Sequence, residues 1–193
     1  KDHNVVCGCD EAGRGPLAGD VFAAAVIFDK DTVIEGINDS KKLTAKKREE
    51  LFDEIMEKAV DFSIQTATVE EIEDINILNA AMLAMKRAVE DMDTKPDVCL
   101  IDGNKTPEGL ECPAIAVVKG DAKSQAVAAA SILAKVARDR YMEQMAEQYP
   151  EYRFEKHKGY GTKLHYQMID QYGPCGIHRM SFLKKYYAKK NGH

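Results

Sequence analysis

The segment Val5-Val6-Cys7-Gly8-Cys9-Asp10-Glu11-Ala12-Gly13-Arg14-Gly15 places two adjacent carboxylates after an apolar stretch and before a glycine-flanked arginine. The apolar stretch predicts a β-strand that ends in a functional site. A carboxylate withdrawn from water needs a positive partner or takes up a proton. Oxygen ligands from Asp and Glu suit Mg²⁺ or Mn²⁺, and backbone N–H groups beside glycine can approach a phosphate or a sugar. The segment therefore predicts a divalent-metal site beside a substrate-binding loop.

The composition fits one main domain in a reducing compartment. The chain has 193 residues, 45% of them hydrophobic, which is enough for a single core. No apolar run reaches the roughly 18 residues of a membrane span. The five cysteines form no repeated Cys-x-x-Cys pairs, and although Cys7 and Cys9 could supply half of a zinc site, we expect free core thiols. We expect a cytoplasmic monomer that does not contact a membrane.

Charge is distributed unevenly along the chain. The formal net charge of −5 taken alone argues against a nucleic-acid partner. From residue 152 to 193, however, nine Lys and Arg residues stand against two acids and alternate with tyrosines and phenylalanines. This mixture suits contact with phosphates and stacking on sugars or bases, although a solvated amphipathic tail fits equally well. We expect a catalytic domain at residues 1–150 and a basic C-terminal region at 151–193 that packs on it and contacts substrate.

Hydrophobic periodicity predicts a mixed α/β architecture. Paired strands are expected within residues 5–28 and at 61–69, and short strands buried on both faces at 98–101 and 114–118. The expected helices cover residues 44–59, 70–92, 124–148 and 162–172. The third helix is rich in alanine, and small residues let a helix lie close to a sheet. The order of elements indicates a mixed β-sheet flanked by helices, with a small helical C-terminal region.

Three of the predicted apolar strands end in acidic residues. Asp10 and Glu11 follow the first strand, and Asp102 and Asp121 follow the two short ones. A single such Asp is usually a turn residue, but sites in α/β sheets gather at strand ends. Four carboxylates brought together could not stay ionised without cations. Two Mg²⁺ or Mn²⁺ ions would match their charge, and two such ions roughly 3.5–4 Å apart form a clamp for displacement at phosphorus.

Other familiar catalytic motifs do not compete with this carboxylate set. The sequence contains no Gly-x-x-x-x-Gly-Lys-Ser/Thr phosphate loop, no Gly-x-Ser-x-Gly elbow and no His-Glu-x-x-His helix. Gly13, Gly15 and Gly19 match a dinucleotide-binding fingerprint only loosely, because Pro16 and an apolar strand follow where a helix should begin.

Several segments distributed over the whole chain form a recognisable series. They are DEAGRGPLAG at 10–19, DSKKL at 39–43, IDGN at 101–104, KGDAKS at 119–124, AAASILAKVARD at 128–139, HKGYGT at 157–162 and IHRMSF at 177–182. In this order they resemble the type 2 ribonucleases H, specifically the bacterial ribonuclease HII family. The resemblance implies a ribonuclease H-like fold and endonucleolytic cleavage of RNA in RNA/DNA hybrids. It also implies incision on the 5′ side of single ribonucleotides in duplex DNA, leaving 5′-phosphate and 3′-hydroxyl ends.

The resemblance also assigns roles to individual residues. The implied metal ligands are the four acids already singled out: Asp10, Glu11, Asp102 and Asp121. Gly13, Arg14 and Gly15 would read the 2′-hydroxyl at the RNA–DNA junction, and Tyr160 would stack on the adjoining deoxyribose. The 2′-hydroxyl distinguishes RNA from DNA, and backbone beside glycine can approach it closely. Arg14 favours ribonuclease HII, because ribonuclease HIII typically has lysine between the two glycines.

Further polar residues are candidates for weaker contacts. Motif position favours phosphate or site contacts by Lys41, Lys42, Lys158 and Asn104, although a surface lysine is by default a solvated charge. His165 is a possible substrate contact, whereas His157 and His178 are expected to be structural even though histidine titrates near neutral pH. Asp139 stands between two arginines, and we expect a local ion pair there.

Two other functions stay open on the sequence. The chain could be a catalytically silent hybrid-binding module on the same fold, but the presence of all four acids argues against that. It could also be another carboxylate-metal nuclease, such as a DNA exonuclease or a resolvase. The Gly13-Arg14-Gly15 loop and Tyr160 favour ribonucleotide reading over the second alternative.

Overall fold

A five-stranded mixed sheet forms the centre of the molecule. The computed structural model describes residues 5–192, and within them the side chains of all but Asp39, Ser40 and Lys41. The strands are β1 (Val6–Ala12), β2 (Val21–Ile27), β3 (Asp61–Ala67), β4 (Val98–Asp102) and β5 (Ala114–Val117), in the order β3-β2-β1-β4-β5. The first three strands pair antiparallel, whereas β4 and β5 continue the sheet from β1 in parallel. The predicted mixed sheet is confirmed.

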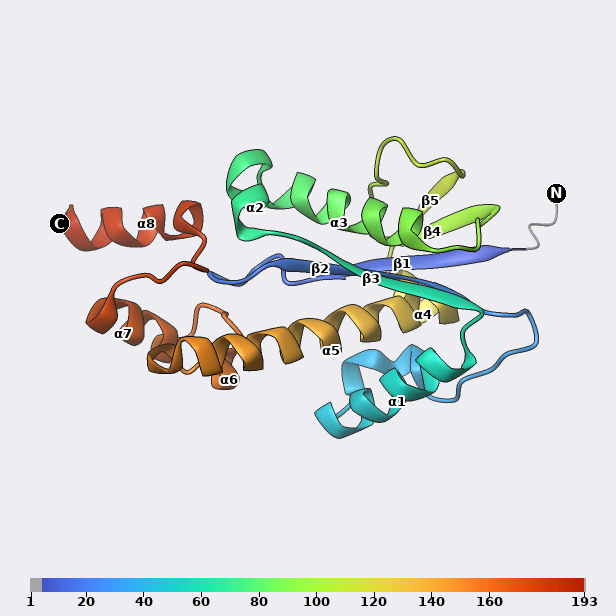
Figure 1. The fold of residues 1–193 in the computed structure, drawn as a ribbon, viewed down its shortest axis with the longest axis horizontal. Helices are drawn as coiled ribbons and strands as arrows, with labels where there is room; N and C mark the ends of the chain where they lie inside the picture. Colours follow the sequence, from blue (N-terminus) through green and yellow to red (C-terminus); the bar gives the residue numbers. More distant parts are fainter. Residues whose placement is uncertain (1–4, 193) are drawn as a thin grey trace.

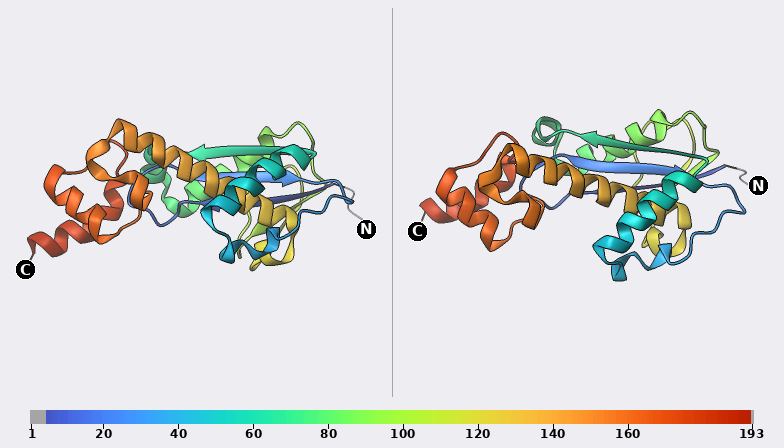
Figure 2. Two further views of the ribbon diagram at one scale, coloured as in Figure 1. Left: turned by 90° about the horizontal axis from the view of Figure 1, so that it is seen from below. Right: turned by 60° about the horizontal axis from the view of Figure 1, so that its bottom comes forward.

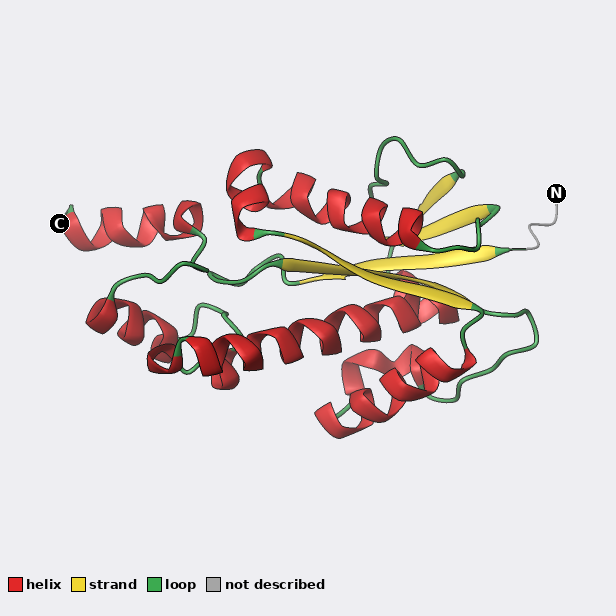
Figure 3. Cartoon of the chain, in the orientation of Figure 1, coloured by secondary structure: helices red, strands yellow, loops and turns green. Residues whose placement is uncertain are grey.

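Helices cover both faces of the sheet (Figures 1 and 3). One face carries α2 (Val69–Ile75) and α3 (Ile77–Asp91), and the other carries α1 (Ala45–Lys58), α4 (Gly120–Lys123) and α5 (Gln125–Gln148). A 3-10 turn, η1 (Ile37–Lys42), precedes α1, and another, η2 (Pro150–Tyr152), follows α5. The chain ends in α6 (Phe154–His157), α7 (Lys163–Tyr172) and α8 (Met180–Asn191).

Small residues bring α5 close to the sheet, as the alanine-rich sequence predicts. Side chains of a strand alternate between its two faces, so Cys7 and Cys9 of β1 join the core on the α3 side. Gly8 and Asp10 consequently face α5. A Cβ atom on Gly8 would lie 2.2 Å from the carbonyl carbon of Ala126, which leaves room only for glycine.

Two elements differ from their predicted form. The single helix expected at 70–92 is two helices, because Asn76 has a non-helical backbone, with φ 72° and ψ 168°. Its side chain caps α3 by accepting the N–H of Asn79, a role that suits asparagine. The strand expected at 114–118 is not buried on both faces. It is the edge strand β5, and Ile115 is 50% exposed.

The acids also lie differently from the expected strand ends. Asp10 and Glu11 stand inside β1, opposite Ala24 and Ala23 of β2, and the strand continues to Ala12. Asp102 is the last residue of β4, as predicted, whereas Asp121 lies in the first turn of α4 rather than directly after β5.

The cysteine prediction is confirmed. All five cysteines are free, and Cys7, Cys9 and Cys99 are buried in the core between the sheet and α3. None of the helices in the described residues is both long and apolar enough to span a bilayer.

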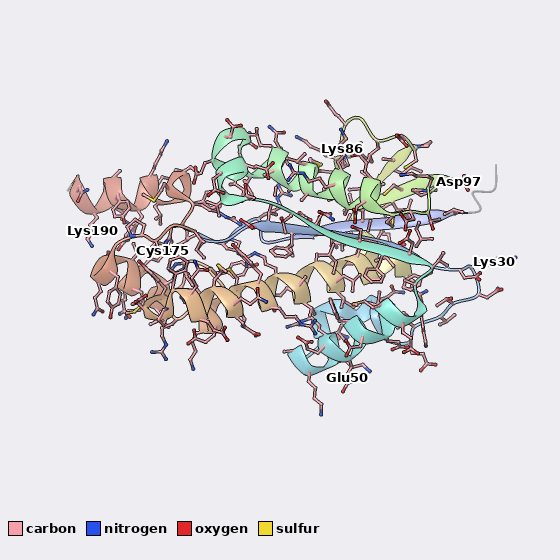
Figure 4. All side chains as sticks on the ribbon, in the orientation of Figure 1. Lys30, Glu50, Lys86, Asp97, Cys175 and Lys190 are labelled. Atoms are coloured by element: carbon pink, nitrogen blue, oxygen red, sulfur yellow. The ribbon has the colours of Figure 1, made fainter. Side chains whose placement is uncertain are left out.

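The C-terminal segment packs at the end of the molecule where α5 finishes (Figure 2). Figure 4 shows Cys175 and Lys190 at this end, opposite Asp97 and Lys30. Tyr152 and Phe154 pack against Ala18 and Met142, and a second cluster joins Leu17 to Ile169 and Leu183. The segment between β1 and β2 is thus held against the C-terminal helices.

Candidate active site

Strand register places two of the four acids side by side. β1 and β4 are parallel, and their pairing runs from Val6 with Val98 to Cys9 with Ile101. The next residues along the two strands, Asp10 and Asp102, therefore neighbour each other on the α5 side. Asp10 is 5% exposed. Asp102 accepts the N–H of Gly120 at 2.7 Å, which holds the start of α4, and with it Asp121, against β4.

The carboxylates destabilise one another's charge. Burial raises the pKa of Asp10 well above its ordinary value, and the neighbouring carboxylates of Glu11 and Asp102 raise it further. Burial also raises the pKa of Asp102, and the charges of Asp121 and Glu11 add to this while the Gly120 N–H opposes it. All four acids are therefore close enough to interact, and the negative charges of Asp10 and Asp102 are not fully compensated within the protein.

The chemistry of these side chains suits divalent cations. In the part of the chain that the structure describes, no three His, Cys, Asp or Glu side chains are already arranged to hold a metal ion. Carboxylate oxygens are nevertheless the ligands that Mg²⁺ and Mn²⁺ prefer. A cation between Asp10 and Asp102 would relieve the repulsion that raises their pKa values. The residues present thus fit such a group, with side-chain rotation needed on binding.

Two cavities meet at Glu11 and Arg14. One, of about 470 Å³, is lined by Gly13, Gly15, Asp121 and Tyr160 as well as these two residues. The other, of about 180 Å³, adds Asp102, Gly103 and Asn104. Arg14 Nη1 lies 3.4 Å from Glu11 Oε1, and its side chain is half exposed. The sequence-predicted acids, the glycine-flanked arginine, Tyr160 and Asn104 are therefore brought to one place.

A larger cavity, of about 540 Å³, lies away from this chemistry. Its lining includes Glu90, Lys95 and Cys112, and none of the residues singled out from the sequence. Volume alone therefore does not identify the functional site.

The remaining predicted contact residues are less well placed to touch a substrate. Lys42 is exposed on η1 and lines neither cavity at Glu11. The ammonium group of Lys158 is 3.0 Å from the carboxylate of Glu143, so its charge is already engaged. The side chain of Lys41 is outside the described residues. His165 is completely buried, so it cannot be the substrate contact that we considered.

The three histidines are buried together, and His165 and His178 are joined in a hydrogen-bonded network. The N–H of Cys175 donates to Nδ1 of His178, so the proton of His178 is on Nε2 and is donated to Nε2 of His165 at 2.9 Å. His165 can then donate from Nδ1 to the carbonyl oxygen of Tyr160, also at 2.9 Å. His157 Nδ1 accepts the N–H of Gly159. His157 and His178 are structural, as predicted, and His165 holds the backbone of Tyr160.

This network makes folding stability depend on acid pH. Burial lowers the pKa of His165 and of His178 to about 4. A charge on His157 lowers the pKa of His165 further, and charges on His165 and His157 lower that of His178. In the unfolded chain these histidines have a pKa of about 6.5. Below that pH the unfolded chain therefore binds more protons than the folded chain. Stability should therefore fall as pH drops from about 6.5 towards 4, by up to about 3 kcal/mol for each ring.

The pH effect can be measured by urea denaturation at pH 7.0 and pH 5.0. We expect the wild type to lose several kcal/mol between these values, and His165→Gln to lose less because one buried imidazole is gone. Comparison of the two proteins cancels the titration of the carboxylates that they share. An equal pH dependence in both would contradict the network's role.

Five residues near the site were not assigned a role from the sequence. Arg48, Ser131 and Lys135 line the larger of the two cavities at Glu11. Arg138 and Arg179 are buried behind the Gly13-Arg14-Gly15 loop and donate to backbone carbonyls.

The sequence contained a signal for the buried position of Arg138. Arg138 stands four residues after Ala134 and four before Met142, both buried, which places an arginine on the inner face of α5.

Asp139 forms its ion pair with Lys135 at 2.9 Å rather than with an adjacent arginine.

Comparison with known proteins shows which family the chain resembles. The family model described as ribonuclease HII matches residues 7–185. A ribonuclease HII of Caldicellulosiruptor saccharolyticus is 56% identical over 182 residues, which are 94% of this chain and 88% of the relative.

Two solved structures share the fold. The crystal structure of ribonuclease H2 from Pyrococcus horikoshii OT3 has a TM-score of 0.80 and 29% identity, with 98% of this chain and 100% of that chain covered. The crystal structure of Bst-RNase HIII in complex with Mn²⁺ has a TM-score of 0.72 at 16% identity, covering 98% of this chain and 71% of that one. Since the family model spans almost the whole sequence and a close relative matches along its length, the chain belongs to the ribonuclease HII family.

Proposed function

We propose that the protein incises duplex DNA on the 5′ side of a single embedded ribonucleotide, as well as cutting the RNA strand of RNA/DNA hybrids. As a member of the ribonuclease HII family, the chain is an RNA/DNA-hybrid endoribonuclease. The proposed cut leaves a 5′-phosphate and a 3′-hydroxyl. It fits roles in removing ribonucleotides and RNA primers from DNA.

One observation carries this proposal. Glu11 borders both the cavity lined by Gly13, Gly15 and Tyr160 and the cavity lined by Asp102. A sugar held by the first group of residues would therefore have its phosphate beside the carboxylates. The sugar that is recognised and the phosphate that is hydrolysed would then belong to the same nucleotide. Ribonucleotide-specific incision requires this geometry.

The carboxylates would hold the catalytic cations. In this proposal Asp10, Glu11, Asp102 and Asp121 bind two Mg²⁺ or Mn²⁺ ions, which supply an activated water and stabilise the leaving oxygen when bound. Asp102 is oriented by the Gly120 N–H, and Asp10 by the N–H of Glu11 at 2.8 Å. These hydrogen bonds orient the two carboxylates.

The glycine-flanked arginine and Tyr160 would read the sugar. The nearest atom to a Cβ on Gly15 is Cε1 of Tyr160 at 3.8 Å, so the loop and the ring stand against each other. Tyr160 is 41% exposed, which leaves a ring face for stacking on a deoxyribose. Backbone N–H groups next to glycine can reach a 2′-hydroxyl, the group that distinguishes RNA from DNA. The basic C-terminal region, residues 151–193, would bind the backbone of the flanking duplex.

The test is cleavage of a labelled DNA duplex that carries one ribonucleotide. With Mn²⁺ or Mg²⁺ we expect a single cut on its 5′ side, a product whose 3′-hydroxyl a polymerase can extend, and no product in EDTA. An all-DNA duplex of the same sequence is the control. Comparable digestion of that control would favour a DNA nuclease, and binding without any cleavage would favour the silent hybrid-binding module.

A further inference from the structure

Two arginines are buried where core residues are usually aliphatic. Arg138 on α5 is 2% exposed and Arg179, at the start of α8, is not exposed at all. Burial lowers the pKa of both, that of Arg179 to about 9, where the charge of Arg138 also contributes. Burying two guanidinium groups beside each other costs folding stability. Aliphatic side chains would fill this space at less cost, so the arginines supply something that packing does not.

Arg179 binds the backbone of the loop between β1 and β2. Its guanidinium donates to the carbonyl oxygen of Gly13 at 2.7 Å, and to those of Arg14 at 3.1 Å and Pro16 at 2.9 Å. Its Nε donates to the carbonyl of Gly19 at 2.8 Å. One side chain thus holds four carbonyl groups within seven residues of the loop.

Arg138 ties the same loop to the segment that carries Tyr160. It donates to the carbonyls of Ala18 at 2.7 Å, Asp20 at 3.1 Å and Lys158 at 2.8 Å. Its guanidinium carbon is 5.9 Å from the centre of the Tyr160 ring. A Cβ on Gly13 would lie 2.2 Å from Nε of Arg138, so the loop and the arginine fit only because residue 13 is glycine.

The held carbonyls fix where the loop's N–H groups point. In a trans peptide the C=O and the N–H of the next residue point in opposite directions. With the carbonyls of Gly13 and Arg14 directed inward to Arg179, the N–H groups of Arg14 and Gly15 must point away from it. Leu17 follows the held carbonyl of Pro16, and its N–H donates to a different partner, the carbonyl oxygen of Gly159, at 2.8 Å.

We propose that Arg138 and Arg179 are positioning residues for ribonucleotide selectivity. They hold the peptide planes of the loop so that the N–H groups of Arg14 and Gly15 face the sugar. They also fix the position of Tyr160 relative to that loop. This inference rests on the proposed reading of the 2′-hydroxyl by Gly13-Arg14-Gly15. Lysine cannot replace either arginine, because it keeps the charge but lacks the planar fork of donors.

The test compares affinities in EDTA, so that neither cations nor cleavage contribute. Fluorescence anisotropy gives the Kd of the full chain for a DNA duplex with one ribonucleotide and for the same all-DNA duplex. In the wild type we expect tighter binding of the first. In Arg179→Lys the ratio of the two Kd values should fall about tenfold, the effect of losing well-placed hydrogen bonds to one sugar hydroxyl.

A matched control separates positioning from simple loss of stability. Val89→Ala removes buried volume from the core on the α3 face, away from the loop, and should lower the melting temperature while leaving the Kd ratio unchanged. A partly unfolded population weakens both affinities equally, so only a positioning role changes the ratio. If Arg179→Lys does not fold, Arg138→Lys takes its place, because all four bonds from Arg179 remain.

The outcomes are distinguishable. A wild-type ratio near one would overturn the proposed reading of the 2′-hydroxyl itself. A wild type that prefers the ribonucleotide, together with lysine variants that keep that preference, would overturn only the role of the arginines.

Discussion

Replacing Asp10 with Asn is expected to abolish cleavage and, in the absence of metal, to make the protein more stable. The amide has nearly the shape of the carboxylate and can still accept the N–H of Glu11. It removes one anionic ligand, and loss of the several kcal/mol that a bound cation contributes to charge stabilisation corresponds to a fall in turnover of about 10³-fold or more. Single-turnover cleavage of the duplex with one ribonucleotide measures this.

The gain in stability follows from the cost of burying this charge. The folded protein raises the pKa of Asp10, so ionisation at neutral pH opposes folding. The contribution of Asp10 to folding stability is complete below the pKa of the unfolded chain. It is lost as pH rises through the higher pKa of the folded protein. A neutral Asn avoids that loss. In EDTA at pH 7.5 the variant should therefore melt at a higher temperature than the wild type, as is common where function needs a destabilised site.

Metal should reverse the order of stability. Binding of Mn²⁺ at the proposed site should raise the melting temperature of the wild type by mass action, whereas Asp10→Asn should respond far less. Glu54→Gln is the matched control, because it removes a partly exposed carboxylate that pairs with Lys58 on α1. Near-normal turnover by Asp10→Asn, or a lower melting temperature in EDTA, would contradict the assignment.

Much of the fold could be predicted because its signals are local. β2 is buried along its whole length, and the sequence shows this as an uninterrupted apolar run. The four acids stood out because charged residues next to apolar strands are costly unless they are used. That Asp10 and Asp102 are neighbours follows from the parallel register of β1 and β4, which the structure shows.

What could not be predicted depends on contacts between distant segments. Asn76 lies within a helical pattern of apolar residues, and the pattern does not show that its backbone leaves the helical conformation between α2 and α3. Whether the apolar residues of β5 are covered depends on which elements pack on the two faces of the sheet at its edge. Arg179 and His165 lie in polar sequence, but their partners are carbonyl groups and rings that the fold brings to them, and a backbone carbonyl has no signature in sequence.

Replacing Gly8 with Ala should destabilise the whole domain, because the added methyl group has no space. Its carbon would be 2.2 Å from the carbonyl carbon of Ala126 and 2.3 Å from the nitrogen of Val127, both backbone atoms of α5. A side chain could rotate away, but here the helix itself must move. We expect a loss of about 3 kcal/mol, which for a chain of this length lowers the melting temperature by roughly 10 °C.

The matched control is another glycine with open surroundings. Gly36 has φ +78°, and a methyl group added there would meet nothing within 4 Å, so Gly36→Ala should cost only the backbone strain of about 1 kcal/mol. Because α5 begins directly after α4, a shift of α5 in Gly8→Ala should also displace Asp121 and reduce cleavage, whereas Gly36→Ala should cleave normally. Equal melting temperatures for the two variants would mean that α5 does not depend on this glycine for its approach to the sheet.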